Sequence, residues 1–171
     1  MDAPRALRST LLGRALPDAI LHRLIGLALA VPTGIVLGLA RWLVPSPEGM
    51  GTHRQLGLGP CVVLTLTGIP CPMCGMTTTF ALMADGRVGE ALLNQPFGVV
   101  LFLATVSAFL LGLWDLTRAL GRWRDVLDWV LARETAVAVA ILVGLFGGWT
   151  YKILLAKEIL PQFLDGLHRH L

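Results

Sequence analysis

Charged residues are scarce in this chain. Aspartate, glutamate, lysine and arginine make up 15% of its 171 residues, whereas soluble domains average roughly a quarter. Hydrophobic residues make up 55%, the mean hydropathy is +0.71, and the apolar residues are collected into long runs. This composition excludes an ordinary soluble domain and predicts an integral membrane protein with a single domain.

Cysteine is scarce as well. Three cysteines are too few for a disulfide framework, and an odd number leaves one unpaired if two are bridged. The net charge of +3 is spread over the flanks of the apolar runs, without a basic patch interleaved with aromatics. That pattern excludes nucleic-acid binding and fits contact with the headgroups of a lipid bilayer. No paired carboxylates and no nucleophile–base set lie near the cysteines. Only a redox enzyme finds support in the sequence, and whether the chain is an enzyme stays open.

Three apolar runs are long enough to cross a bilayer as helices. We therefore predict an all-α, polytopic membrane helix bundle with three transmembrane helices and a re-entrant or broken hairpin that contains the cysteines. In the alternative, the cysteine segment also crosses and there are four spans. The predicted segments are 1–23, a basic amphipathic N-terminus; 24–44, the first span; 45–96, the loop and cysteine hairpin; 97–114, the second span; 115–134, an amphipathic connector; 135–151, the third span; and 152–171, the tail.

The cysteine hairpin contains no charged residue from Gln55 to Ala84. Gly68 and Pro70 break any helix in this passage, and a new helix is expected to start at about Met76, capped by Thr77 or a neighbour. Irregular backbone at membrane depth is tolerated only where protein or water covers it. The pattern therefore favours a hairpin that is covered by the spanning helices.

The arginines predict the orientation, because cytoplasmic segments of membrane proteins contain an excess of lysine and arginine. With three spans, the N-terminus and the 115–134 connector lie in the cytoplasm, and the cysteine hairpin faces the opposite side. With four spans, the connector and its four arginines lie outside, which the same rule disfavours.

The sequence CPMCG at residues 71–75 has the spacing of a metal knuckle, in which a tight turn lets two thiolates reach one ion. Pro72 fixes φ, and Gly75 lets the backbone curl so that amides point at a sulfur. A structural zinc takes four ligands, so two more are needed. We predict zinc or another soft ion in a metal-stabilised module that acts as a binding or assembly partner of a membrane protein. The predicted metal ligands are His53, Cys61, Cys71 and Cys74.

The same thiols support two other interpretations. In one, Cys71 and Cys74 are the active pair of a membrane thiol–disulfide oxidoreductase, because a helix N-terminus lowers the pKa of a thiol, and Cys61 is the exchange partner. No thioredoxin pattern and no second cysteine pair accompany them. In the other, the three cysteines are small residues in a packed hairpin, without a cofactor. The sequence leaves the metal, redox and structural roles open.

Residues 67–78, TGIPCPMCGMTT, and the later Gln95-Pro96 resemble a bacterial membrane family catalogued as domain of unknown function 2752. The resemblance covers about residues 49–113. The family commonly has arginine where this chain has Thr78, and asparagine where it has Gln95, so a role of that arginine is not carried over. The resemblance implies a small multi-pass protein of the bacterial cytoplasmic (inner) membrane, and it implies no activity.

Overall fold

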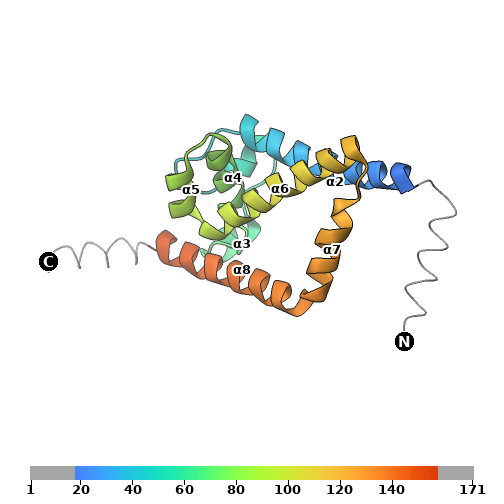
Figure 1. Cartoon of the computed structure of the whole chain (residues 1–171). Helices are drawn as coiled ribbons and strands as arrows, with labels where there is room; N and C mark the ends of the chain where they lie inside the picture. Colours follow the sequence, from blue (N-terminus) through green and yellow to red (C-terminus); the bar gives the residue numbers. More distant parts are fainter. Residues whose placement is uncertain (1–17, 158–171) are drawn as a thin grey trace. The chain divides into compact units, whose positions relative to one another are not determined.

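The computed structural model describes residues 18–157, and the regular secondary structure of this part of the chain is all helical, without a strand (Figure 1). The elements in chain order are α2 (Asp18–Trp42), the 3-10 helix η1 (Thr52–Leu56), α3 (Val62–Thr67), α4 (Met76–Ala84), α5 (Val88–Asn94), α6 (Pro96–Arg118), α7 (Arg122–Ala132) and α8 (Glu134–Ala156).

Three of these helices, α2, α6 and α8, are long and apolar enough to cross a membrane. Their mean hydropathies are 1.9, 2.2 and 1.7, and most of their side chains face outward, as expected of helices whose solvent is lipid. The predicted all-α class with three candidate spans is confirmed. Whether the cysteine hairpin is re-entrant stays a prediction.

Some predicted segment bounds differ from those of the structure. The second long helix, α6, continues to Arg118, so the first residues of the predicted connector belong to it. The third, α8, begins at Glu134 and includes Lys152, which the sequence pattern assigned to the tail. The predicted amphipathic N-terminus, up to residue 17, and the tail from residue 158 lie outside the described residues.

The described chain divides into two compact units. One contains residues 18–35 and 105–134, and we call it the arginine unit. The other contains residues 36–104 and 135–157, and we call it the cysteine unit. All three cysteines and every residue of the predicted metal site belong to the cysteine unit.

In the arginine unit, two glycines bring α2 and α6 into backbone contact. A Cβ atom on Gly26 would lie 2.6 Å from the amide nitrogen of Leu116 and 2.7 Å from the carbonyl oxygen of Gly112. A Cβ atom on Gly112 would lie 2.7 Å from the amide nitrogen of Ala30. Small residues are the usual means of close helix packing in membranes, where no hydrophobic effect drives helices together.

The turn between α6 and α7 is organised by a buried carboxylate. Asp115 is completely buried, and its two oxygens accept hydrogen bonds from the amides of Arg122 and Trp123, each at 3.0 Å. These amides are the first two of α7, where no carbonyl within the helix is available. The Trp123 indole in turn donates to Nδ1 of His22 at 3.2 Å. Asp115 therefore acts as the cap of α7 from the preceding helix.

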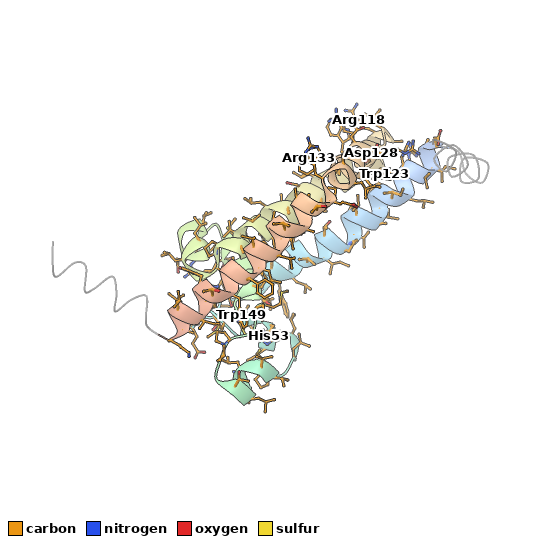
Figure 2. The ribbon with its side chains drawn as sticks, turned by 90° about the horizontal axis from the view of Figure 1, so that it is seen from below. His53, Arg118, Trp123, Asp128, Arg133 and Trp149 are labelled. Atoms are coloured by element: carbon orange, nitrogen blue, oxygen red, sulfur yellow. The ribbon has the colours of Figure 1, made fainter. Side chains whose placement is uncertain are left out.

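Arginines stack on tryptophans throughout this unit. Arg118, Trp123, Asp128 and Arg133 gather around α7 (Figure 2). The guanidinium carbons lie 5.1–5.6 Å from ring centroids in four pairs, a geometry that places the cation over the electron-rich face of the ring. The pairs are Arg118–Trp114, Arg122–Trp114, Arg124–Trp123 and Arg133–Trp129.

In the cysteine unit, the short helices α4 and α5 pack side by side (Figure 1). Leu82 of α4 and Ala91 of α5 form a buried core with Val99 of α6. The helix α8 packs on the start of α6, because Gly144 and Gly148 leave space for the side chain of Phe97. Two glycines of α8 thus allow close packing, whereas Gly147 faces open space.

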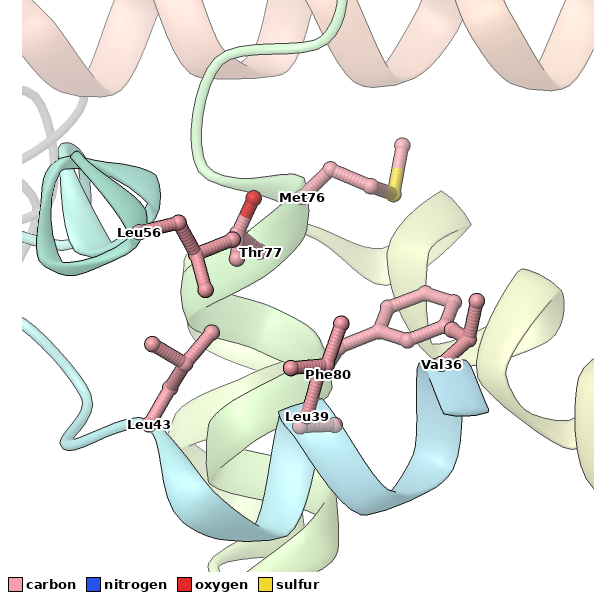
Figure 3. Close-up of a pocket in the computed structure, with 8 residues that line it drawn as sticks. Val36, Leu39, Leu43, Leu56, Met76, Thr77 and Phe80 are labelled. Carbon is pink, nitrogen blue, oxygen red and sulfur yellow. The ribbon is translucent and has the colours of Figure 1, made fainter. Parts of the chain in front are cut away.

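The far side of α4 carries an apolar hollow of about 230 Å³ (Figure 3). Phe80 and Met76 of α4 form one wall, and Leu56 of η1 closes an end. The opposite wall is made by α2, through Val36, Leu39, Ala40 and Leu43. The cysteine loop is thus followed directly by α4, and apolar packing of Met76 and Phe80 holds this helix in place.

We expect Asp115→Asn to destabilise the protein, because one of the two capping bonds is replaced by an amide NH₂ that faces an N–H donor. The loss in free energy of unfolding is expected to be roughly 1–2 kcal/mol, visible as a lower melting temperature by circular dichroism in detergent. The control is Asp128→Asn on the exposed face of α7. Equal melting temperatures for the two variants would contradict the capping role.

Candidate metal centre

The cysteine loop is a tight turn between α3 and α4. The amide of Cys74 donates to the carbonyl oxygen of Cys71 at 2.9 Å, and the amide of Met76 donates to that of Met73 at 3.1 Å. The amide of Cys71 points at the sulfur of Cys74, at 3.3 Å. A hydrogen bond from an amide to a sulfur favours the thiolate, the form that binds a metal. The helix α4 starts at Met76, as predicted, but its cap is Gly75 with φ +89° and no side chain supplies a capping bond.

The three cysteine sulfurs come together in one cluster. The Sγ atoms of Cys61, Cys71 and Cys74 all lie within 4.8 Å of one another, and those of Cys71 and Cys74 are 3.3 Å apart. All three are free thiols. Sulfurs bound to one tetrahedral zinc at about 2.3 Å lie about 3.8 Å apart, a value within the range spanned here. Small shifts would let this cluster hold one metal ion.

His53 is not a member of this cluster, although it borders the same cavity. The cavity has a volume of about 360 Å³ and is lined by the three cysteines together with His53, Met50 and Met73, among others. The ring lies on η1, and its Nε2 atom is 3.3 Å from the carbonyl oxygen of Gly59. The structure thus brings three of the four predicted ligands together and places the fourth at the cavity wall.

The thiols at the two ends of the cluster differ in acidity. The pKa of Cys61 is lowered to about 7, mainly by the backbone N–H of Leu64 in the first turn of α3, with further hydrogen bonds from the other two cysteines. The pKa of Cys74 is raised to about 12, mainly because burial disfavours the thiolate. Cys61 is therefore the reactive thiol at neutral pH, and Cys74 is the protected one.

Side chains from three later segments hold the cysteine loop by its carbonyl oxygens. Trp149 of α8 donates its indole N–H to Pro70 at 2.6 Å. Asn94, the last residue of α5, donates to Gly75 at 3.1 Å, and Gln95 donates to Pro72 at 3.4 Å. Non-helical carbonyls in an apolar setting need such partners. The loop is therefore positioned by tertiary contacts, including those of α8.

A buried lysine lies against the same loop. Lys152 of α8 is 2% exposed, and its ammonium donates to the side-chain oxygen of Asn94 at 2.6 Å and to the carbonyl oxygen of Gly49 at 3.1 Å. A Cβ atom on Gly75 would lie 3.1 Å from Nζ of Lys152 and 2.9 Å from the oxygen of Gly49. Glycine at position 75 thus meets two needs, a positive φ and the close approach of the lysine.

Sequence reasoning missed the residues that hold the loop. Asn94 and Gln95, to which the sequence analysis assigns no role in the site, are both buried and bonded to the cysteine loop. The Oε1 atom of Gln95 is itself a buried acceptor without a hydrogen-bond partner in the described part of the chain. The signal for Lys152 was available, because a single ionisable residue within an apolar run is by default a functional hypothesis in a membrane protein.

The segment that contains the cysteines matches a known protein family. Residues 61–109 match the family described as Protein of unknown function (DUF2752). The match confirms the predicted resemblance over these residues. The matched segment contains all three cysteines, Asn94 and Gln95, and excludes His53 and Lys152. No curated protein and no solved structure matches the chain.

Gly75→Ala is expected to destabilise the protein more than Gly68→Ala. Both positions have positive φ, at +89° and +68°, so each substitution costs about 1–2 kcal/mol for the left-handed backbone. Only position 75 is also crowded, by Gly49 and Lys152, whereas a Cβ at position 68 meets no atom within 4 Å. Thermal unfolding of the two variants measures the difference, and equal losses would mean that the lysine can move away without cost.

Alkylation is expected to select Cys61 over Cys74 in the metal-free protein at pH 8. Cys61, with its pKa of about 7, is mostly thiolate there, and Cys74, with a pKa of about 12, is not. The rates should differ by at least about a hundredfold. Iodoacetamide labelling followed by peptide mass spectrometry measures both rates, and the unfolded protein, in which they converge, is the control. Comparable rates in the folded protein would contradict the assigned environments.

Proposed function

We propose that this protein is a metal-stabilised module of the membrane, in which Cys61, Cys71 and Cys74 bind zinc or a similar soft ion as thiolates. The observation that carries the proposal is the cluster of three sulfurs within 4.8 Å of one another. Thiolate ligands at knuckle spacing select zinc and other soft ions. The three apolar helices support placement in a membrane, which we propose to be the bacterial cytoplasmic membrane.

We propose His53 as the fourth ligand. It lines the cavity that the three cysteines line. Its Nε2 atom is occupied by the Gly59 carbonyl, so Nδ1 is the nitrogen that we assign to the metal. A metal-bound histidine usually has a hydrogen-bond partner on its other ring nitrogen, which orients the ring.

In this proposal the metal closes the loop formed by η1, α3 and the CPMCG turn. Few side chains of these segments are buried, and α3 has no buried residue. Its apolar residues Val62, Val63 and Leu66 are exposed beside Cys61. A metal that ties Cys61 to the turn would fix this surface, which we propose presents the module to a membrane-protein partner.

The metal hypothesis predicts about one equivalent of bound metal per chain in protein purified without chelators. Cys71→Ser should remove at least half of it, because the remaining ligands are too few for tight binding. Leu66→Ala, on the exposed face of α3 and outside the cavity lining, is the control and should retain the metal. Elemental analysis measures the content. Less than about half an equivalent in the unaltered protein, together with no change in Cys71→Ser, would refute the hypothesis.

The close approach of Cys71 and Cys74, 3.3 Å between sulfurs, favours a second candidate, a membrane thiol–disulfide oxidoreductase. The low pKa of Cys61 suits it to attack a Cys71–Cys74 disulfide. Alkylation of unreduced membranes separates the candidates. A redox pair is protected as a disulfide and released by thiol reductants, whereas a metal-bound set is released by chelators. Full alkylation without either treatment would contradict both.

A further inference from the structure

Lys152 has the geometry of a buried ammonium ion. Its Nζ atom donates to three oxygens, the side-chain oxygen of Asn94 at 2.6 Å, the carbonyl oxygen of Gly49 at 3.1 Å and that of Asn94 at 3.4 Å. An ammonium group has three donors and no acceptor, so three oxygens satisfy it completely. The side chain is 2% exposed, and the charge is therefore removed from water.

None of these three acceptors has a negative charge. The ion pairs formed by residues 18–157 do not include Lys152. An isolated buried charge is strongly unfavourable, so buried charges are paired or neutralised. The ammonium lies against Gly75, the residue that directly follows Cys74. The cysteine cluster is therefore the place from which a compensating charge would come.

We infer that Lys152 is the counter-charge of the metal–thiolate centre and lets all three cysteines bind one divalent ion as thiolates. This inference rests on the proposed function. Three thiolates around a divalent ion leave one net negative charge, and a single ammonium compensates it. Without the lysine, that charge would lie uncompensated beside a buried loop, and one thiol is then expected to stay unbound.

The role is distinct from that of a ligand or of a loop anchor. Asn94 and Trp149 hold carbonyl oxygens of the loop, which fixes its shape. Lys152 bonds to no atom of the CPMCG turn and reaches it through Gly75 and through Asn94. Removal of the Lys152 charge should therefore change the number of thiolates that bind the metal ion. A change in the shape of the loop alone would not change that number.

The experiment titrates the full-length, detergent-purified protein with cadmium(II) after removal of bound metal. Affinity is read from thiolate-to-cadmium absorption, and thiols protected from alkylation are counted by mass spectrometry at saturation. The unaltered chain is expected to protect three thiols. Lys152→Met is expected to bind at least about tenfold more weakly and to protect two. The matched control is Tyr151→Phe, which removes a 2.6 Å hydrogen bond from the same helix to Leu93 of α5 without removing a charge, and it should behave as the unaltered chain.

A second variant, Asn94→Asp, keeps the lysine and gives it a carboxylate partner in place of the neutral oxygen at 2.6 Å. Asn94→Asp also loses the amide that donates to Gly75, and the control Asn94→Leu loses this donor without gaining a charge and should protect three thiols. In Asn94→Asp the ammonium is compensated within the protein, so this variant should also protect two thiols. It tests the inference if Lys152→Met does not fold, as judged by thermal unfolding. Three protected thiols and unchanged affinity in a folded variant would overturn the inference alone. Failure of the unaltered chain to bind cadmium would overturn the proposed function and the inference with it.

Discussion

A buried loop of irregular backbone must find hydrogen-bond partners, and this requirement governs the cysteine unit. The carbonyl oxygens of Pro70, Pro72 and Gly75 point away from their own segment and receive donors from Trp149, Gln95 and Asn94. Each unsatisfied group would cost about 1–3 kcal/mol. Since the donors come from α5, α8 and the junction before α6, the loop takes its shape only when those helices are in place. The cysteine cluster is thus a consequence of tertiary folding as well as of knuckle spacing.

Asn94 connects the cysteine loop and α4 to the buried lysine of α8. Its amide nitrogen donates to Gly75 and to the hydroxyl of Thr79, and its oxygen accepts from Lys152. The Asn94 side chain therefore forms hydrogen bonds with the loop, with α4 and with α8 at the same time. Glycine at positions 49 and 75 is required on either side, because a Cβ atom on Gly49 would overlap the Asn94 side-chain oxygen and one on Gly75 would crowd the lysine. Substitutions at Asn94, Lys152, Gly49 and Gly75 should therefore have non-additive effects on stability.

The parts that could be predicted from sequence are those set by local physics. Long apolar runs predict α2, α6 and α8 because helix length and bilayer thickness match. The tight turn between Cys71 and Cys74 is predicted by their spacing of three residues. The curled backbone after it is predicted by the glycine at position 75. The contacts of Lys152 could not be predicted, since its partners Asn94 and Gly49 lie 58 and 103 residues away. The cap of α7 by Asp115 depends on a tight reversal that composition does not encode.

The charge of the site bears on the choice of its fourth ligand. Four thiolates around a divalent ion would leave two negative charges, and the one buried ammonium in contact with the loop would compensate only one of them. A neutral fourth ligand keeps the centre and Lys152 in balance. His53 is neutral when it binds a metal through one nitrogen and donates through the other, and it lines the same cavity as the three cysteines. In the proposed site, three thiolates, a neutral histidine and a lysine would balance the charge of one divalent ion, and a fourth cysteine would not.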